Sequence, residues 1–560
     1  MKRNLARLIG LLACQAVLAC NGYVEGTGGA AGSKPSLSTP DTPIATADAV
    51  ALLENPPAEP VAAEIACTDQ AVVPRGRIWR LSASAYRNSI KDKLAYADVD
   101  AASAPLDSVT ESKFSASSRQ NVVSQPWADW FFAQGEKIGA QIVTALPAPH
   151  SCMIAAGASA ACSKAFVEEF AGRLFRRPVT PDELARYQTA YGKWLTEMSP
   201  GDATWALLQA WTMSPSHVFR TELGDRKLGK VELTQYEIAS EISFSFGNTA
   251  PDAALLADAQ QGKLSDTAVV RAHAERLLNG PAGREVLKAF FFEFLHLREL
   301  AGGGALPAAE AALVPSMQAE TAGFVEDVVF NQAGGLDMLL SATTSTVDQP
   351  LATFYGVSAG TRVETKRSGL LHQAAFLNTR RDATRRGLFV VGELLCSPPA
   401  PPPPEVAEKA ATLVFEEDAT GREVQGVIQN AGVVCASCHK TFAPEGLAFE
   451  HYDELGKFRE QQNGQAIDVT GSFLATGDVS GAFTDSADMV KKIVASNQGQ
   501  LCFSKRFVSY LQGRSAHGVL DGCLISKARQ RLSESKLDLL EFMVELSQDA
   551  SFYQRINLEN

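Results

Sequence analysis

The stretch TQYEIASEISFSF, residues 234–246, decides the fold class. A Thr followed three residues later by Glu is a capping box, the signal that starts a helix. Ile238, Ile242 and Phe246 then recur at helical spacing. The same start signal, with proline at the first helical position, stands at TPDE, residues 180–183. Similar apolar stripes recur along the chain, whereas residues 465–470 are the best of few strand candidates. The sequence therefore predicts a mainly α fold, a multi-layer helical body.

Composition narrows the class of protein. The chain has 560 residues, 46% hydrophobic and 20% charged, which is typical of globular domains and excludes disorder for the bulk. Its formal net charge of −12 argues against nucleic acid as a partner, because no basic surface is available to neutralise phosphates. No run of eighteen apolar residues follows the N-terminus. Function must therefore be sought in the two ends and in a few motifs.

The first twenty residues predict export and a lipid anchor. A basic start is followed by an apolar run over residues 8–19, too short to span a bilayer. The run ends in VLAC, residues 17–20, which resembles a bacterial lipobox with Cys20 as the lipidated residue. The alternative is a plain signal peptide cleaved nearby. Asn21 is not the Asp associated with inner-membrane retention. We therefore expect an extracytoplasmic lipoprotein held on the outer membrane by its acyl chains.

Composition shifts and proline runs predict the domain organisation. A Gly, Ala, Ser and Pro-rich tether follows the signal, and PPAPPPP at residues 398–404 predicts an extended linker. The predicted units are a signal peptide (1–19), the tether (20–66), helical domains (67–150, 151–228 and 229–365), a helix with the polyproline linker (366–404), a cytochrome c-like haem segment (405–500) and a C-terminal helical domain (501–560).

The motif CASCH, residues 435–439, carries the sharpest chemistry. In a c-type haem the two thiols bind the porphyrin covalently and the adjacent His ligates the iron. With ten Cys and eight His in the chain, chance would produce the motif roughly 0.003 times. A disulfide, a thioredoxin-like C-x-x-C or a zinc site are alternatives, but no βαβ pattern surrounds the motif and only His451 is near it. We therefore expect haem c attached to Cys435 and Cys438, with His439 as the proximal iron ligand.

The distal side of the iron has several candidate ligands. Met489 follows His439 at a separation typical of small mono-haem cytochromes, but lies in an amphipathic stretch where Met usually packs in a core. His451 and His372 are further alternatives, and an open position would favour peroxide or oxygen chemistry.

The surroundings of the proximal ligand are also predicted. A short helix should run from about Cys435 to near Pro444, with the Nδ1–H of His439 donating to a backbone carbonyl. Phe442, Leu447 and Phe449 should form an apolar haem wall.

Six further cysteines indicate disulfides in an exported chain. Closeness in sequence favours Cys152–Cys162 and Cys502–Cys523, which leaves Cys67–Cys396 by elimination. The alternative is that one or more of them, Cys396 above all, is a free buried thiol.

Several blocks in a fixed order resemble a known family: FAGRLFRRPVT (170–180), SPSHVFRTE (214–222), LLCSPP (394–399), the motif at 435–439 and GLAFE (446–450). They are similar to those of the planctomycete-type cytochrome-like family of large exported proteins, from about residue 77 to the end. The resemblance implies a string of domains of unknown function around a cytochrome-like piece. Within the first block, the pair Arg176 and Arg177 could bind a carboxylate or a haem propionate, or form a structural salt bridge.

Together these features predict a lipid-anchored mono-haem protein that transfers electrons to or from a redox protein partner. The rival hypotheses are a haem-dependent oxidase or peroxidase, and an envelope structural or binding protein with a vestigial haem site. Whether the protein is an enzyme stays open on the sequence.

Overall fold

The computed structural model describes residues 56–60, 62–68, 72–95, 98–106, 114–115, 122–144, 146–157, 159–301, 311–416, 418–535 and 537–558. The predicted signal peptide and Cys20 lie outside the described residues. The end of the predicted tether is not a free linker, because Ala62 and Ile65 are buried in the main core. Their small apolar side chains pack where the short helix Ala62–Glu64 meets the C-terminal helices.

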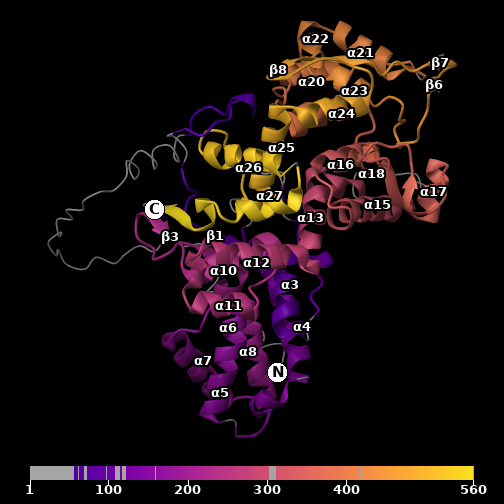
Figure 1. The fold of residues 1–560 in the computed structure, drawn as a ribbon. Helices are drawn as coiled ribbons and strands as arrows, with labels where there is room; N and C mark the ends of the chain where they lie inside the picture. Colours follow the sequence, from indigo (N-terminus) through magenta and orange to yellow (C-terminus); the bar gives the residue numbers. More distant parts are fainter. Residues whose placement is uncertain are drawn as a thin grey trace.

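The predicted mainly α fold is confirmed, and the molecule is elongated (Figure 1). Helices α5 to α8 form one end, and α20 to α22 form the other. The elements of the first end are β1 (Arg77–Arg80), α3 (Ala83–Leu94), α4 (Gln125–Thr144), α5 (Ala160–Phe166), α6 (Gly172–Phe175), α7 (Pro181–Trp194), α8 (Pro200–Thr212), α9 (Pro215–Val218) and β2 (Phe219–Glu222).

A central layer of helices follows. Its elements are β3 (Gly229–Glu232), α10 (Gln235–Gly247), α11 (Ala253–Gln260), α12 (Thr267–Asn279), α13 (Pro281–Phe294), α15 (Val314–Glu326), α16 (Leu336–Ser341), β4 (Thr344–Val347), α17 (Gln349–Tyr355), β5 (Gly360–Glu364), α18 (Ala374–Thr379) and α19 (Ala383–Phe389).

The last third of the chain builds the far end and then returns to the centre. Its elements are α20 (Pro404–Ala410), α21 (Gly421–Asn430), α22 (Val433–His439), α23 (Ala443–Leu447), β6 (Gln461–Gln462), β7 (Gln465–Ala466), β8 (Gly471–Thr476), β9 (Val479–Phe483), α24 (Ser486–Ala495), α25 (Asn497–Gln512), α26 (Gly522–Glu534), α27 (Leu539–Leu546) and β10 (Gln554–Asn557).

The helices form for the reasons that the sequence indicates. Both predicted capping boxes are present, with Thr180 and Glu183 at α7 and Thr234 and Glu237 at α10. The apolar stripes face two hydrophobic cores. The smaller core lies among α3, α4, α6 and α8, and the larger one joins the central helices to α24–α27. Burial of these stripes is the main stabilising contribution to the fold.

Each sheet in the described part of the chain has two antiparallel strands. Strand β1 pairs with β2, and β10 returns from the C-terminus to pair with β3, with Gln554 opposite Glu232. The prediction of one strand over residues 465–470 is wrong in its bounds. Two residues, Gln465–Ala466, form a tight hairpin with β6, and β8 begins only at Gly471.

Three disulfides are present in the part of the chain that the structure describes. Cys152–Cys162 forms as predicted. The other two predicted pairings are wrong, because the bonds are Cys67–Cys523 and Cys396–Cys502. The physical reason is tertiary: the N-terminal segment packs against the C-terminal helices, and the segment that follows α19 meets α25. Closeness in sequence therefore did not decide which thiols meet. No helix among the described residues is long and apolar enough to cross a membrane.

Candidate functional site

The motif at residues 435–439 lies on one short helix at the far end of the molecule (Figure 1). The predicted bounds are wrong: α22 begins at Val433 and ends at His439, instead of running from Cys435 to near Pro444. Pro444 stands in the first turn of a separate helix, α23. Proline is tolerated in a first turn but cannot continue a helix, so the chain breaks before it.

Both thiols of the motif are unpaired, in contrast to the six disulfide cysteines. Cys435 is buried and Cys438 is half-buried. The pKa of the Cys438 thiol is raised, mainly by burial and to a smaller extent by the neighbouring Cys435. A thioredoxin-like nucleophile needs the opposite shift, because the thiolate is the reactive form. The raised pKa therefore favours Cys438 as a neutral thiol.

The side chain of His439 is held by an amide. Its Nδ1 lies 2.8 Å from Oε1 of Gln425 on α21, and Nε2 of Gln425 donates to Oγ1 of Thr384 over 2.8 Å. The expected partner, a backbone carbonyl, is wrong, because α21 packs along α22 and brings a buried glutamine beside the ring. An amide oxygen only accepts, so Nδ1 carries the proton.

That tautomer leaves the lone pair on Nε2. Burial lowers the pKa of His439, which keeps the imidazole neutral near pH 7. A neutral imidazole with a free Nε2 lone pair is the form that ligates a metal ion. Gln425 thus orients the group that the motif predicts as a ligand.

Two glycines bring α19 and α23 into close contact just after the motif. A Cβ on Gly446 of α23 would stand 1.8 Å from the carbonyl oxygen of Ala383, and one on Gly387 of α19 would stand 2.1 Å from that of Phe442. No side chain fits at either position. Arg386 adds four charged hydrogen bonds to nearby carbonyls, among them 2.7 Å to that of Tyr452. Helices α19 and α23 are therefore closely packed next to the chain that follows α22.

Several exposed apolar side chains lie in the segment that leads into the motif. Of the thirteen large hydrophobic side chains that are exposed in the described ranges, five lie between residues 414 and 434. Val433 on α22 and Val414 before α21 are 83% and 86% exposed. The other three are Phe415, Val427 and Val434. Clustered exposed apolar side chains indicate a surface that a ligand or partner covers.

Only part of the predicted apolar wall lies beside His439. The Phe442 ring is buried and its centroid is 4.8 Å from that of the His439 ring. Leu447 is buried on α23. The placement predicted for Phe449 is wrong, because this ring packs in the main core against His372 at 5.3 Å. The turn after α23 directs Phe449 inward toward the central helices.

The distal candidates differ in their surroundings. Met489 on α24 is fully buried in the large core, a cluster that contains neither Cys435 nor Phe442. His451 is half-buried, with its ring 5.7 Å from that of Phe458. His372 has both ring nitrogens in hydrogen bonds, to the Ser368 carbonyl and the Ser486 hydroxyl. His372 is therefore a structural core residue.

Sequence reasoning missed three residues of this site. Gln425 and Thr384 form the chain of contacts to His439, and no motif announces either of them. Glu445 is buried on α23, and burial raises its pKa to about 7. Its Oε2 has no hydrogen-bond partner among the described residues. In the part of the chain that the structure describes, no three His, Cys, Asp or Glu side chains group together as a metal site.

The fold and the motif define a mainly helical protein with a C-x-x-C-H helix that packs along α21. Three family models match the chain, each described as a protein of unknown function: PSD5 (DUF1595) over residues 162–222, PSD4 (DUF1592) over residues 233–357 and PSCyt3 (DUF1588) over residues 367–462. Together they span about half of the chain, and the last one contains the motif. The chain belongs to the planctomycete cytochrome-like family, a multi-domain family of unknown function. No curated protein and no solved structure matches it.

Proposed function

We propose that this protein is a mono-haem c-type cytochrome-like protein that acts in electron transfer outside the cytoplasm. The observation that carries the proposal is the state of α22, which presents two unpaired thiols and a histidine whose Nε2 lone pair is free. When bound, haem would supply a one-electron iron couple. Cys435 and Cys438 would hold it through thioethers, each S–H adding across a vinyl double bond.

The residues around α22 support this assignment. His439 would ligate the iron through Nε2, because Gln425 occupies Nδ1. The exposed side chains of Val414, Val433 and Val434 offer an apolar surface that a porphyrin would cover. The neutral thiol of Cys438 suits covalent attachment better than redox exchange.

Haem attachment is tested by a pyridine haemochrome spectrum on the full-length chain expressed with the cytochrome maturation machinery. We expect covalently retained haem in the wild type and its loss in Cys435→Ser/Cys438→Ser. A matched control is Cys152→Ser/Cys162→Ser, which removes two cysteines elsewhere and should retain the haem. Absence of a Soret band in the wild type would refute the proposal.

A second candidate function is a haem-dependent oxidase or peroxidase. Met489 is buried in the core, and both ring nitrogens of His372 are in hydrogen bonds. Neither residue is therefore placed as a distal ligand, which favours an open position on the iron. A high-spin ferric spectrum and turnover with peroxide would favour this candidate. A six-coordinate low-spin spectrum would favour the electron carrier.

The location and the partner are also proposals. The lipobox-like sequence supports acylation of Cys20. The mature chain, which begins at Cys20, would lose the three positive charges of residues 1–19 and carry a net charge of −15 rather than −12. Such an acidic body would not be attracted to anionic lipid, so the acyl chains would provide the anchor. Labelling with radioactive palmitate should mark the wild type and not Cys20→Ala. An unlabelled wild type would contradict the anchor, and a redox protein partner would then be sought in the soluble fraction.

A further inference from the structure

A cavity of about 320 Å³ lies far from the motif, between the start of α10 and the segment that joins α6 to α7. Four arginines line it: Arg176, Arg177, Arg220 and Arg226. The rings of Phe175, Phe219 and Tyr236 line it as well. A volume near 300 Å³ is within the range of pockets that bind small molecules.

Arg176 is the most unusual of the four. Its side chain is buried, and its two Nη groups donate to the carbonyls of Leu174, Ser216, His217 and Phe219. No carboxylate among the described residues forms an ion pair with it, and the charged groups that act on it are two other arginines. The pKa of Arg176 is lowered to about 9, mainly by burial and to a smaller extent by the positive charges of Arg220 and Arg177. A buried guanidinium without a counter-ion is costly, and an anion in the cavity would offset that cost.

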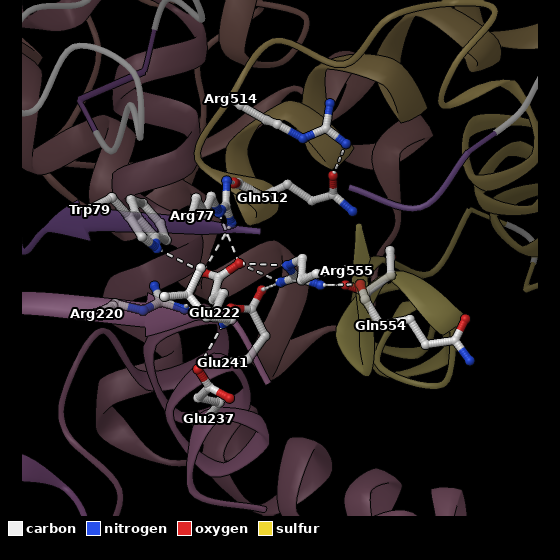
Figure 2. Close-up of polar contacts among 12 residues, drawn as sticks. Arg77, Trp79, Arg220, Glu222, Glu237, Glu241, Gln512, Arg514, Gln554 and Arg555 are labelled. Atoms are coloured by element: carbon white, nitrogen blue, oxygen red, sulfur yellow. Dashed lines mark hydrogen bonds and ion pairs between the residues drawn. The ribbon is translucent and has the colours of Figure 1, made fainter. Parts of the chain in front are cut away.

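Arg220 belongs to a buried ion network that Figure 2 shows. Three arginines, Arg77, Arg220 and Arg555, converge on two glutamates, Glu222 and Glu241. Arg220 binds Glu241 over 2.5 Å through one Nη group.

The network leaves one donor of Arg220 without a partner. The Nε of Arg220 is buried and has no hydrogen-bond partner among the described residues. Arg220 also lines the cavity, so a buried arginine of the network stands at the cavity wall together with Arg176.

The other charged residues at the wall are an ion-paired arginine, a carboxylate held by backbone N–H groups and an exposed arginine. Arg177 is paired with Glu183 by two hydrogen bonds of 2.8 Å, which makes it a structural salt bridge. Glu237 is the only carboxylate among the residues that line the cavity. Its oxygens already accept from the backbone N–H groups of Leu223 and Gly224. Arg226 is exposed on the turn between β2 and β3.

We propose that this cavity binds a small organic oxyanion, a carboxylate or a phosphate ester, against Arg176, Arg220 and Arg226. The arginine forks suit carboxylate and phosphate oxygens. The aromatic rings at the wall suit an organic body attached to the anionic group. A purely structural role explains the four carbonyl contacts of Arg176, but it accounts neither for the cavity nor for the unpartnered Nε of Arg220.

The test uses the full-length protein and isothermal titration calorimetry with two probes, inorganic phosphate and citrate, at constant ionic strength. Arg176 is not substituted, because it holds four carbonyls and its loss would disturb the fold. Thr221 is exposed, lines the cavity and allows a matched pair of variants. Thr221→Glu adds a negative charge at the wall, and Thr221→Gln adds the same bulk without charge.

We expect saturable binding of at least one probe, and the probe that binds distinguishes phosphate from carboxylate chemistry. Thr221→Glu should abolish binding, and Thr221→Gln should retain it within about threefold. Arg226→Gln should weaken binding by about tenfold, since it removes a hydrogen bond to a charged group. Arg186→Gln, at an exposed arginine on α7 outside the cavity, should leave binding unchanged. No saturable binding of either probe, or equal binding by the two Thr221 variants, would overturn the proposal.

Discussion

Nδ1 of His439 lies 2.8 Å from the amide oxygen of Gln425, and this contact joins two helices of the C-x-x-C-H module. It determines which ring nitrogen carries the proton and therefore which one has its lone pair free. A residue ten positions before the first cysteine thus sets the tautomer of the histidine in the motif. The contact also allows a direct test of the proposed haem site.

Substitution of Gln425 should change the reduction potential of the proposed haem. Gln425→Glu should lower the potential, because a carboxylate that accepts from Nδ1–H makes the imidazole a stronger donor to the iron. Gln425→Leu should raise it, because the acceptor is lost. Gln429→Leu, on the same helix, is the matched control. Spectroelectrochemical titration measures all four proteins, and equal potentials for the two Gln425 variants would contradict the positioning role.

Removal of the proximal ligand should separate iron ligation from covalent attachment. His439→Ala should leave both thiols able to form thioethers but shift or abolish the Soret band. Phe442→Ala removes the ring that packs at 4.8 Å and should leave the axial ligand in place. Optical spectra of the purified variants measure both effects. If His439→Ala keeps the wild-type spectrum and potential, the assignment of His439 as proximal ligand is wrong.

The close contact of α23 with α19 should not tolerate a side chain at Gly446. Gly446→Ala should reduce the free energy of unfolding by about 2 kcal/mol or more, because the new Cβ would meet the backbone carbonyl of Ala383 and the helices must separate. Gly426→Ala is the matched control, since nothing lies within 4 Å of its Cβ position on α21. That variant should gain about 0.5 kcal/mol. Urea denaturation measures both, and a neutral Gly446→Ala would show that the contact is not tight.

The disulfide that closes a long loop should stabilise the fold more than the one that closes a short loop. Cys67–Cys523 joins residues 456 positions apart, whereas Cys152–Cys162 spans 10. A longer closed loop restricts the unfolded chain more, so Cys67→Ser/Cys523→Ser should lower the free energy of unfolding by about 4 kcal/mol or more. Cys152→Ser/Cys162→Ser should lower it by about 3 kcal/mol or less. Thermal and urea denaturation under oxidising conditions test the order, and a larger effect of the short loop would contradict it.

The buried carboxyl of Glu320 should make stability depend on pH. Burial raises its pKa to about 7, and the nearby carboxylate of Asp348 acts in the same direction. The hydrogen bond from Tyr355, 2.6 Å long, and the charge of Arg367 oppose this increase but do not cancel it. Between pH 4.5 and 7 the folded state keeps this proton while the unfolded state loses it. Stability therefore falls as pH rises through this window, by about 3 kcal/mol in total.

Glu320→Gln cannot ionise, so this loss should be absent from the variant. Urea denaturation at pH 5 and pH 8 measures the difference for each protein. Glu408→Gln, at an exposed position on α20, should behave like the wild type. A wild-type pH dependence that persists unchanged in Glu320→Gln would show that another group causes it.

The helical class, the capping boxes and the C-x-x-C-H helix could be predicted from the sequence because each depends on residues close together in the chain. Thr234 and Glu237 stand three positions apart, and their side chains satisfy each other's backbone N–H groups wherever the helix packs. Cys435, Cys438 and His439 lie on α22 for the same local reason. Cys152–Cys162, ten residues apart, was predicted correctly on the same basis.

Only the tertiary structure decided which distant groups meet. The partner of Cys523 is Cys67 because the N-terminal segment packs on the C-terminal helices, a contact that no sequence spacing encodes. Phe449 lies in the core rather than beside His439 because the turn after α23 sets its direction. Gln425 lies beside His439 because α21 packs along α22. The packing around Arg176 brings no carboxylate of the described residues next to it. Local hydrogen bonds determine where helices begin, but the packing of apolar faces determines which side chains become neighbours.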